Sequence, residues 1–274
     1  MKIITIILCG LLLAACAAPG QGTANTPQAQ QYPPVIVDSD ARQKAAQDAW
    51  KSFLEQYGIS GVVIELEPVL NTPHSLPLET QGRINISKRN APFGEIEAKE
   101  VLRAFIESHP GLLSGDPKAA SLNLKDLSLV SFTVDQNFYQ ATYKQVSYPF
   151  PVAQDYGELL LAMSKNGTLH QCQSTLIPTL ELPTEAEVNV EELKSRLMNR
   201  EFTYTNIAGK RQSYRITSRA EIVVKDLVVY PKRESGKISI HLAYPVEAGS
   251  GMLWTVYFDA IKGQELGVKQ NFVS

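Results

Sequence analysis

Histidine, cysteine and carboxylate side chains are the groups with which this sequence could bind a metal or transfer a proton. The histidines stand at positions 74, 109, 170 and 241, and none lies in the H-E-x-x-H helix of a zinc peptidase. His170 and Cys172 are two residues apart on a predicted strand, a spacing that puts both side chains on one face, as a metal site would need. No third ligand lies nearby in the sequence, so we interpret the pair as part of a half-exposed strand and expect no metal.

The carboxylates also lack the partners that catalysis requires. Glu95, Glu97 and Glu100 precede or begin a predicted helix, where they complement its positive N-terminus. Asp259 begins a turn that Gly263 ends, and its side chain is expected to accept backbone N–H groups there. An acid–base role for Asp259 would need a second titratable group, and the sequence indicates none. No nucleophile elbow, phosphate-binding glycine loop or C-x-x-C pair is present, so we expect no catalytic residue and no cofactor.

The first fifteen residues have the pattern of a secretion signal. Lys2 precedes an apolar run from Ile3 to Leu13, and the small residue Ala15 marks the predicted cleavage point. The run is shorter than the roughly 20 apolar residues that a membrane-spanning helix needs. Leu13-Ala14-Ala15-Cys16 resembles a lipobox, in which the cysteine is diacylated and becomes the first residue. The alternative is an ordinary signal peptide followed by a chance cysteine.

Lipidation would place the protein in the cell envelope. Each buried methylene contributes about 0.8 kcal/mol, and two or more acyl chains hold a protein stably on a bilayer. Because Ala17 rather than Asp follows Cys16, we expect the periplasmic face of the outer membrane in an organism with two membranes. With one membrane, the outer face of the plasma membrane is expected. Residues 16–37 are predicted to be the lipidated N-terminus and a flexible tether, because 17–34 carry no charge and almost no bulky apolar residue.

Charge and cysteine content exclude further classes. Removal of the signal takes one basic residue, Lys2, and leaves 25 Lys and Arg against 28 Asp and Glu, with no basic block. Nucleic acid is therefore not an expected partner. Cys9 leaves with the signal and Cys16 carries lipid, so Cys172 is the remaining thiol and no internal disulfide is possible. The core must be stabilised by burial alone.

The rest of the chain predicts an α+β protein. Residues 38–96 contain a helix with apolar residues at helical spacing, ended by Gly58, and short strand candidates at 61–66 and 83–87. Residues 97–182 begin with an amphipathic helix over 97–108 and continue with strand patterns at 127–134, 138–146, 158–163 and 168–176. Asn166-Gly167 is a two-residue hairpin signal. Residues 183–274 repeat this outline, with a helix near Asn189 and strand patterns at 213–217, 221–230, 237–246, 252–259 and 265–272.

Two groups of motifs carry a family resemblance. Leu242-Ala243-Tyr244-Pro245-Val246, the run from Trp254 to Ala260, and Gly263 resemble the end of the PepSY domain in thermolysin-type propeptides. Upstream, the run from Ala141 to Val146, Pro151-Val152, Leu159-Leu160-Leu161 and Asn166-Gly167-Thr168-Leu169 are similar to the fungalysin/thermolysin propeptide (FTP) motif. The resemblance covers about residues 60–274. It departs from the pattern before Val152, where the family's glycine is missing and Ser147-Tyr148-Pro149-Phe150-Pro151 stands instead.

The resemblance implies two cystatin-like units, each a helix on an antiparallel sheet, FTP-like over 97–182 and PepSY-like over 183–274. Family propeptides cover, inhibit and help to fold a zinc peptidase, and no peptidase domain follows in this chain. The implied function is a lipid-anchored, non-catalytic module that inhibits or assists the folding of a secreted zinc metallopeptidase in trans. Phe272 and Val273, bulky residues of the kind thermolysin-like pockets favour, are the expected partner-binding residues. An envelope structural or assembly lipoprotein without a peptidase partner is the alternative, and an enzyme is a third, less favoured one.

Overall fold

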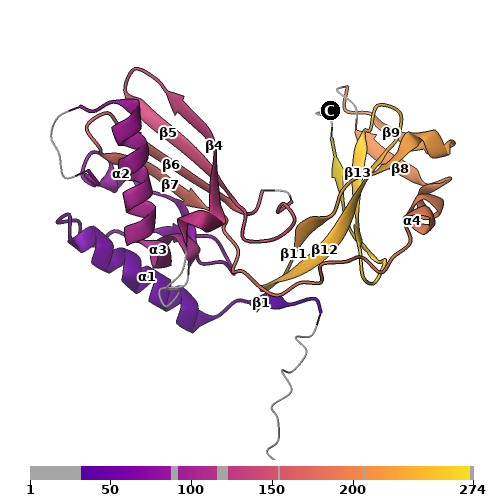
Figure 1. Cartoon of the computed structure of the whole chain (residues 1–274), viewed down its shortest axis with the longest axis horizontal. Coiled ribbons are helices and arrows are strands. Elements are labelled where there is room, and N and C mark those ends of the chain that lie inside the picture. Colours follow the sequence, from indigo (N-terminus) through magenta and orange to yellow (C-terminus); the bar gives the residue numbers. More distant parts are fainter. Residues whose placement is uncertain (1–31, 88–91, 116–122, 154, 206–207, 272–274) are drawn as a thin grey trace, which may run out of the picture. The chain divides into compact units, whose positions relative to one another are not determined.

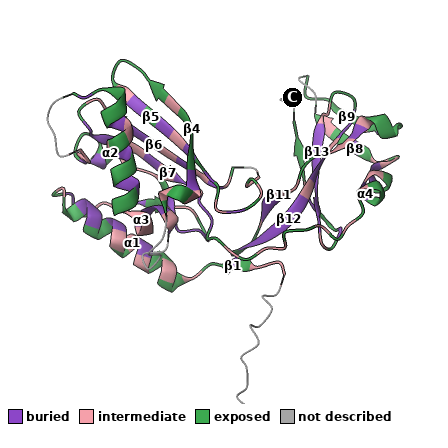
Figure 2. Cartoon of the chain, viewed as in Figure 1, coloured by how far each residue is buried: buried purple, intermediate pink, exposed green. Residues whose placement is uncertain are grey.

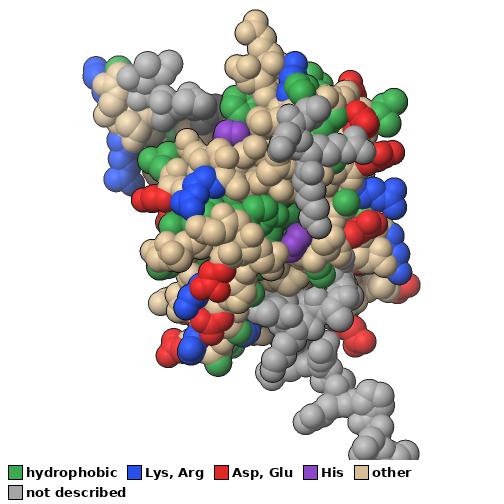
Figure 3. Space-filling view, turned by 90° about the vertical axis from the view of Figure 1, so that its left-hand side faces the viewer, with side chains coloured by type: hydrophobic (Ala, Val, Ile, Leu, Met, Phe, Trp, Pro, Cys, Tyr) green, Lys and Arg blue, Asp and Glu red, His purple; other side chains and the backbone are tan. Residues whose placement is uncertain are grey.

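A computed structural model describes residues 32–87, 92–115, 123–153, 155–205 and 208–271, which belong to one compact unit. The predicted signal, cleavage residue Ala15 and lipidated Cys16 lie outside the described residues, as do Phe272 and Val273. In the described part of the chain, no helix is both long and apolar enough to cross a membrane. On the side that Figure 3 shows, acidic and basic side chains are interspersed and do not gather by sign.

Three α-helices of the described residues precede the first large sheet. They are α1 (Asp40–Glu55), α2 (Glu95–Ser108) and α3 (Pro110–Ser114). The side chain of Ser39 caps α1 by accepting a hydrogen bond from the backbone N–H of Arg42. The buried residues of α2 are Ala98, Leu102, Phe105 and Ile106, which form the apolar stripe that the sequence predicts. This stripe lies in one core cluster with Trp50 and Phe53 of α1.

The first large sheet is an antiparallel meander in the order β4-β5-β6-β7. Its strands are β4 (Leu127–Val134), β5 (Phe138–Gln145), β6 (Glu158–Ser164) and β7 (Leu169–Ser174). The predicted Asn166-Gly167 hairpin joins β6 to β7, and Gly167 has the positive φ of 86° that favours glycine. Helix α2 covers one face of this sheet (Figure 1). Alternate residues of β5, such as Tyr139, Ala141 and Tyr143, are buried in the core of that side.

The second large sheet is built around the long strand β12, and α4 (Val190–Leu197) is its helix. Its strands are β1 (Val35–Val37), β10 (Ile222–Val224), β11 (Val228–Glu234), β12 (Lys237–Ala248), β13 (Trp254–Asp259) and β14 (Glu265–Gln270). One edge of β12 pairs with β10 and β11, and the other pairs with β1 and β13. All of these pairs are antiparallel, so the described fold is α+β, as predicted.

Short elements complete the described structure. They are the hairpin of β2 (Glu65–Leu66) and β3 (Pro73–Ser75), the hairpin of β8 (Glu201–Thr205) and β9 (Arg211–Arg215), and the 3-10 turns η1 (Leu78–Thr80), η2 (Leu124–Asp126) and η3 (Arg219–Glu221). The second strand of the β8–β9 hairpin was predicted at 213–217, but its partner β8 was not predicted. Most residues of β8 are polar, and only Phe202 is buried. The sequence therefore has too few apolar residues in this segment to predict a strand.

The predicted tether over 16–37 is wrong at its C-terminal end. Val35–Val37 forms strand β1, with Val35 opposite Ser239, Ile36 opposite Ile238 and Val37 opposite Lys237. Residues 237–239 of β12 lie beyond the end of β13, so β1 supplies the hydrogen-bonding partner that they would otherwise lack. A strand of three residues is too short to show a period-2 pattern in the sequence.

Candidate functional site

The middle of one face of the β4-β5-β6-β7 sheet carries mainly neutral polar side chains, and no helix of the described residues covers it. Register places Thr133, Gln140, Ala162 and Gln171 in one row across the four strands. The neighbouring row contains Ser131, Thr142, Leu160 and Gln173. This surface, which we call the open face, arises because side chains alternate along each strand, and the other set is buried under the helices.

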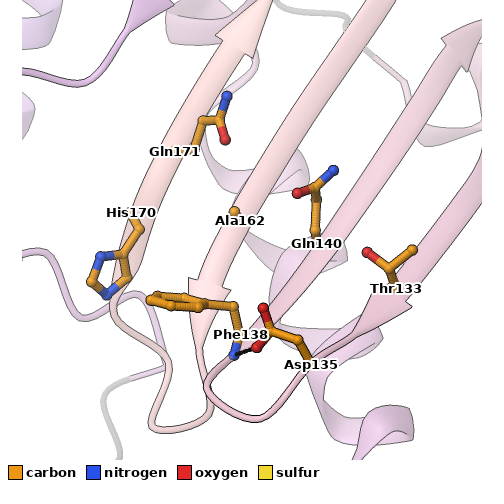
Figure 4. Close-up of a pocket in the computed structure, with 7 residues that line it drawn as sticks. All are labelled: Thr133, Asp135, Phe138, Gln140, Ala162, His170 and Gln171. Carbon is orange, nitrogen blue, oxygen red and sulfur yellow. Dashed lines mark hydrogen bonds between the residues drawn. The ribbon is translucent and has the colours of Figure 1, made fainter.

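A hollow of about 270 Å³ lies on the open face at Ala162. Alanine is short, so the side chains of Gln140 and Gln171 on the neighbouring strands stand above it (Figure 4). The rings of Phe138 and His170 close one end in an edge-to-face contact with centroids 4.8 Å apart. Burial lowers the pKa of His170 below its usual value.

Asp135 holds the turn at the same end of the hollow. Its carboxylate accepts the backbone N–H of Asn137 at 2.7 Å and of Phe138 at 2.6 Å. These two bonds, from Asn137 first and then from Phe138, hold the pKa of Asp135 below its usual value. The carboxylate is therefore occupied in shaping the β4–β5 turn, and the turn in turn positions Phe138.

Three carboxamides on the open face have unused hydrogen-bonding groups. Gln140, Gln171 and Gln173 make no side-chain hydrogen bond to another residue in the described ranges. Each carboxamide offers an acceptor oxygen and two N–H donors, the same groups that a peptide bond presents. The two central rows contain no charged residue. The carboxylates of this face lie at its margins, where Asp135 lines the hollow and Glu67, Asp155 and Glu158 line a pocket over the neighbouring row. The open face is suited to a neutral polar chain such as an extended polypeptide.

The expectation that His170 and Cys172 share one face is wrong. Cys172 lies in the helix-side core with no exposed surface, whereas His170 lines the hollow. The register shifts between Ala162 and Met163, which leaves His170 as an extra residue and breaks the alternation. Burial also raises the pKa of the Cys172 thiol far above its usual value. Among the described residues, no group of three or more His, Cys, Asp or Glu is placed to hold a metal.

Asp259 has the titratable partner that the sequence did not reveal. Its Oδ2 atom lies 2.7 Å from Nδ1 of His241, and Nε2 of the same ring lies 2.9 Å from Oγ of Ser239. The hydroxyl of Tyr32 donates to the same Oδ2 at 3.1 Å. The Tyr32 ring meets the His241 ring edge to face, with centroids 6.0 Å apart. We call these four residues the buried polar cluster.

Ser239, His241 and Asp259 contact one another in the order of a Ser-His-Asp triad, but a substrate cannot reach the serine. The exposed fraction is 2% for His241, 0% for Asp259 and 7% for Ser239. A nucleophile must meet its substrate, and the Oγ atom of Ser239 is enclosed between paired strands. The arrangement therefore stabilises the second sheet and its junction with β1. The spacing of Ser239 and His241, two apart on one strand, is a signal that sequence analysis could have used.

Hydrogen bonds set the charge state of Asp259. Its Oδ1 atom accepts the backbone N–H of Ile261 at 2.8 Å and of Lys262 at 2.7 Å, which confirms the predicted turn. Burial alone would raise the pKa of this carboxyl, but the bonds from His241, Lys262 and Ile261 outweigh burial and hold its pKa below the usual value. For Tyr32, burial first and then the Asp259 carboxylate raise the pKa well above the usual range.

Comparisons with known proteins do not assign this chain to a family. No family model matches it, and no curated protein matches it. Among solved structures, the chain is similar to the Bacillus megaterium YpeB C-terminal domain, with 14% sequence identity and a TM-score of 0.31. That similarity covers 85% of this chain and 98% of the other. A likeness at this TM-score does not establish a shared function.

Proposed function

We propose that this protein is a lipid-anchored, non-catalytic binding module of the cell envelope that holds another polypeptide. The observation that carries the proposal is the open face, where Gln140 and Gln171 present unused carboxamides at the hollow and Gln173 presents another in the neighbouring row. Antiparallel sheets commonly leave one face to solvent, and this face presents amide groups with which the main chain of a partner can form hydrogen bonds.

The proposed architecture is two cystatin-like units, FTP-like and then PepSY-like. Helix α2 lies against the first large sheet, and α4 packs by Leu193 and Leu197 into a core with Trp254 and Phe258 of the second. Together with the motif resemblance, this arrangement supports a propeptide-like role. The proposed partner is therefore a secreted zinc metallopeptidase, which the module inhibits or helps to fold.

Titration of a thermolysin-like peptidase with residues 16–274, carrying Cys16→Ser to avoid lipid, tests this function. We expect inhibition, or a higher yield of active peptidase on refolding, at concentrations where serum albumin has no effect. Deletion of residues 269–274 tests Phe272 and Val273, and unchanged inhibition would remove the tail from the binding site. Absence of both inhibition and refolding assistance would contradict the peptidase role.

A pull-down from envelope extracts separates this proposal from the alternative. Recovery of a zinc peptidase with the wild-type chain, and its loss with Gln140→Ala/Gln171→Ala/Gln173→Ala, supports the proposed function. Recovery of assembly or cell-wall components instead would favour the envelope structural lipoprotein. Because these three side chains are on the surface, the variant is expected to fold like the wild type, and circular dichroism provides the control.

A further inference from the structure

Strand β4 is an edge strand whose outer side is unpaired. It pairs with β5 alone, and no backbone group of residues 128–134 bonds to a described residue outside β5. Its sequence, LSLVSFTV, contains neither a charge nor a proline, the residues that usually protect an edge from pairing. Val130 and Val134 are 51% and 49% exposed. The one feature of β4 that opposes pairing with another strand is the bulge at the register shift between Leu129 and Ser131.

A groove runs between this edge and α2. It has a volume of about 520 Å³, and we call it the α2–β4 groove. Its apolar lining comes from Leu124, Leu127, Leu129 and Tyr143. The groove lies on the helix side of the sheet, opposite to the open face, so the two surfaces are separate.

The charged lining of the α2–β4 groove is mainly basic. Lys99, Arg103 and Lys125 line it, with Glu107 as the acidic residue among the described lining residues. Arg103 pairs with Glu107 at 3.4 Å, and Lys99 pairs with Glu95 at 2.6 Å. Lys125 makes no ion pair with any residue that the structure describes. A carboxylate entering the groove would therefore meet a positive charge that no described side chain neutralises.

We propose that the α2–β4 groove binds an extended segment of a partner protein that adds a strand to β4 and carries a carboxylate on the groove side. This inference rests on the proposed function that the chain binds another polypeptide. The main chain of an added strand would lie about 4.7–4.9 Å from β4 and satisfy its unpaired N–H and C=O groups. Alternate side chains of that strand then enter the groove, where the apolar lining takes an aliphatic group and Lys125 takes the carboxylate.

The positive charge of the groove favours an acidic segment of a partner protein over a second copy of this chain. A second β4 strand would bring only uncharged side chains to Lys125, because β4 itself has no carboxylate. An acidic partner strand satisfies both the edge and the cation. A second copy would reveal itself as concentration-dependent dimerisation.

Two soluble fluorescein-labelled peptides of eight residues test the inference. Both alternate valine and threonine, and they carry either glutamate or lysine at one central position. We expect the glutamate peptide to bind the exported chain more tightly than the lysine peptide, in fluorescence anisotropy. A lysine on an edge strand opposes strand addition, so Val134→Lys should weaken binding at least about tenfold. Lys125→Glu should reverse the preference between the two peptides.

Matched controls keep the outcome tied to the groove. Val63→Lys places the same substitution at a valine that is 73% exposed and lies outside both sheets, and it should bind like the wild type. Equal binding of the glutamate peptide by wild type and Val134→Lys, or binding by neither, overturns the inference. So does dimerisation of the wild type that Val134→Lys abolishes, in sedimentation velocity. The two proposals fail separately. Loss of the glutamate preference in peptide binding overturns the groove whatever the peptidase assay shows, and peptide binding without peptidase inhibition or refolding assistance overturns the peptidase role and leaves the groove standing.

Discussion

The two large sheets of this protein use their polar residues in opposite ways. The β4-β5-β6-β7 sheet buries one face under helices and shows Gln140, Gln171 and Gln173 on the other. The two central strands of the second sheet are buried on both faces: every residue of β13 is buried, and β12 is buried along most of its length (Figure 2). Its polar residues bond to one another. The first sheet therefore has surface left for a partner, and the second serves as the stable support.

The burial pattern explains why the second sheet needs its buried polar cluster. A buried carboxylate without partners would be strongly destabilising, and Asp259 has four hydrogen-bond donors, from His241, Tyr32, Ile261 and Lys262. These bonds join β12, β13 and the segment before β1. The open face needs no such network, because water satisfies its carboxamides. Substitutions in the two sheets should therefore differ in their effect on folding.

The largest expected effect is from Asp259→Ala. The substitution leaves the His241 ring, the Tyr32 hydroxyl and two turn N–H groups without their acceptor in a buried site. We expect a loss of about 3–5 kcal/mol in the free energy of unfolding, measured by urea denaturation. Asp135→Ala, which removes an exposed turn carboxylate from the first sheet, is the matched control and should cause a much smaller loss, because water can reach the N–H groups that it leaves unbonded. Equal losses for the two variants would break the comparison.

Acid should destabilise the protein through the same carboxylate. The folded pKa of Asp259 is lower than its usual value, so its ionised form stabilises the fold above the unfolded pKa of about 3.9. This contribution is lost as the pH falls from there through the folded pKa. Unfolding free energies between pH 6 and about pH 3 should decrease more steeply for the wild type than for Asp259→Asn. Parallel curves would show that Asp259 does not set the acid sensitivity.

Tyr32→Phe should have an intermediate effect. The hydroxyl donates to Asp259 and accepts the backbone N–H of Leu242 at 3.1 Å, so its removal leaves that N–H unbonded. We expect a loss of about 1–3 kcal/mol in stability and faster hydrogen exchange at the backbone of 237–242. Tyr156→Phe, at a half-buried tyrosine outside the buried polar cluster, serves as the comparison. Unchanged exchange at 237–242 would mean that β1 is held by strand pairing alone.

The smallest effect on stability is expected on the open face. Gln171→Ala removes a side chain that makes no hydrogen bond to a described residue, so the free energy of unfolding should change by less than about 0.5 kcal/mol. Thermal unfolding measures this change. Binding of the proposed partner should weaken in the same variant, because its carboxamide is lost. A clearly destabilised Gln171→Ala would show that the open face supports the fold as well as a partner.

The sequence predicted the local elements of the first sheet well. The apolar stripe of α2 and the four meander strands follow from periodicity within each segment, and Asn166-Gly167 marks its own turn. The bulge at His170 escaped prediction, because one extra residue changes which face a side chain takes without changing the composition of the strand. The hollow was not predicted either, because Ala162 and its two glutamine neighbours are brought together only by the register of three strands.

By itself, the amino-acid sequence determined the α+β class, the helix-then-meander order and the Asp259 turn, because each depends on residues close together in the chain. Only the tertiary structure decided that His241 and Tyr32 meet Asp259 and that β1 completes the second sheet. Tyr32 and Asp259 are 227 residues apart, and no periodic pattern encodes such a contact. It arises because β12 extends beyond β13 and the buried edge of a strand must be hydrogen-bonded by whichever segment reaches it.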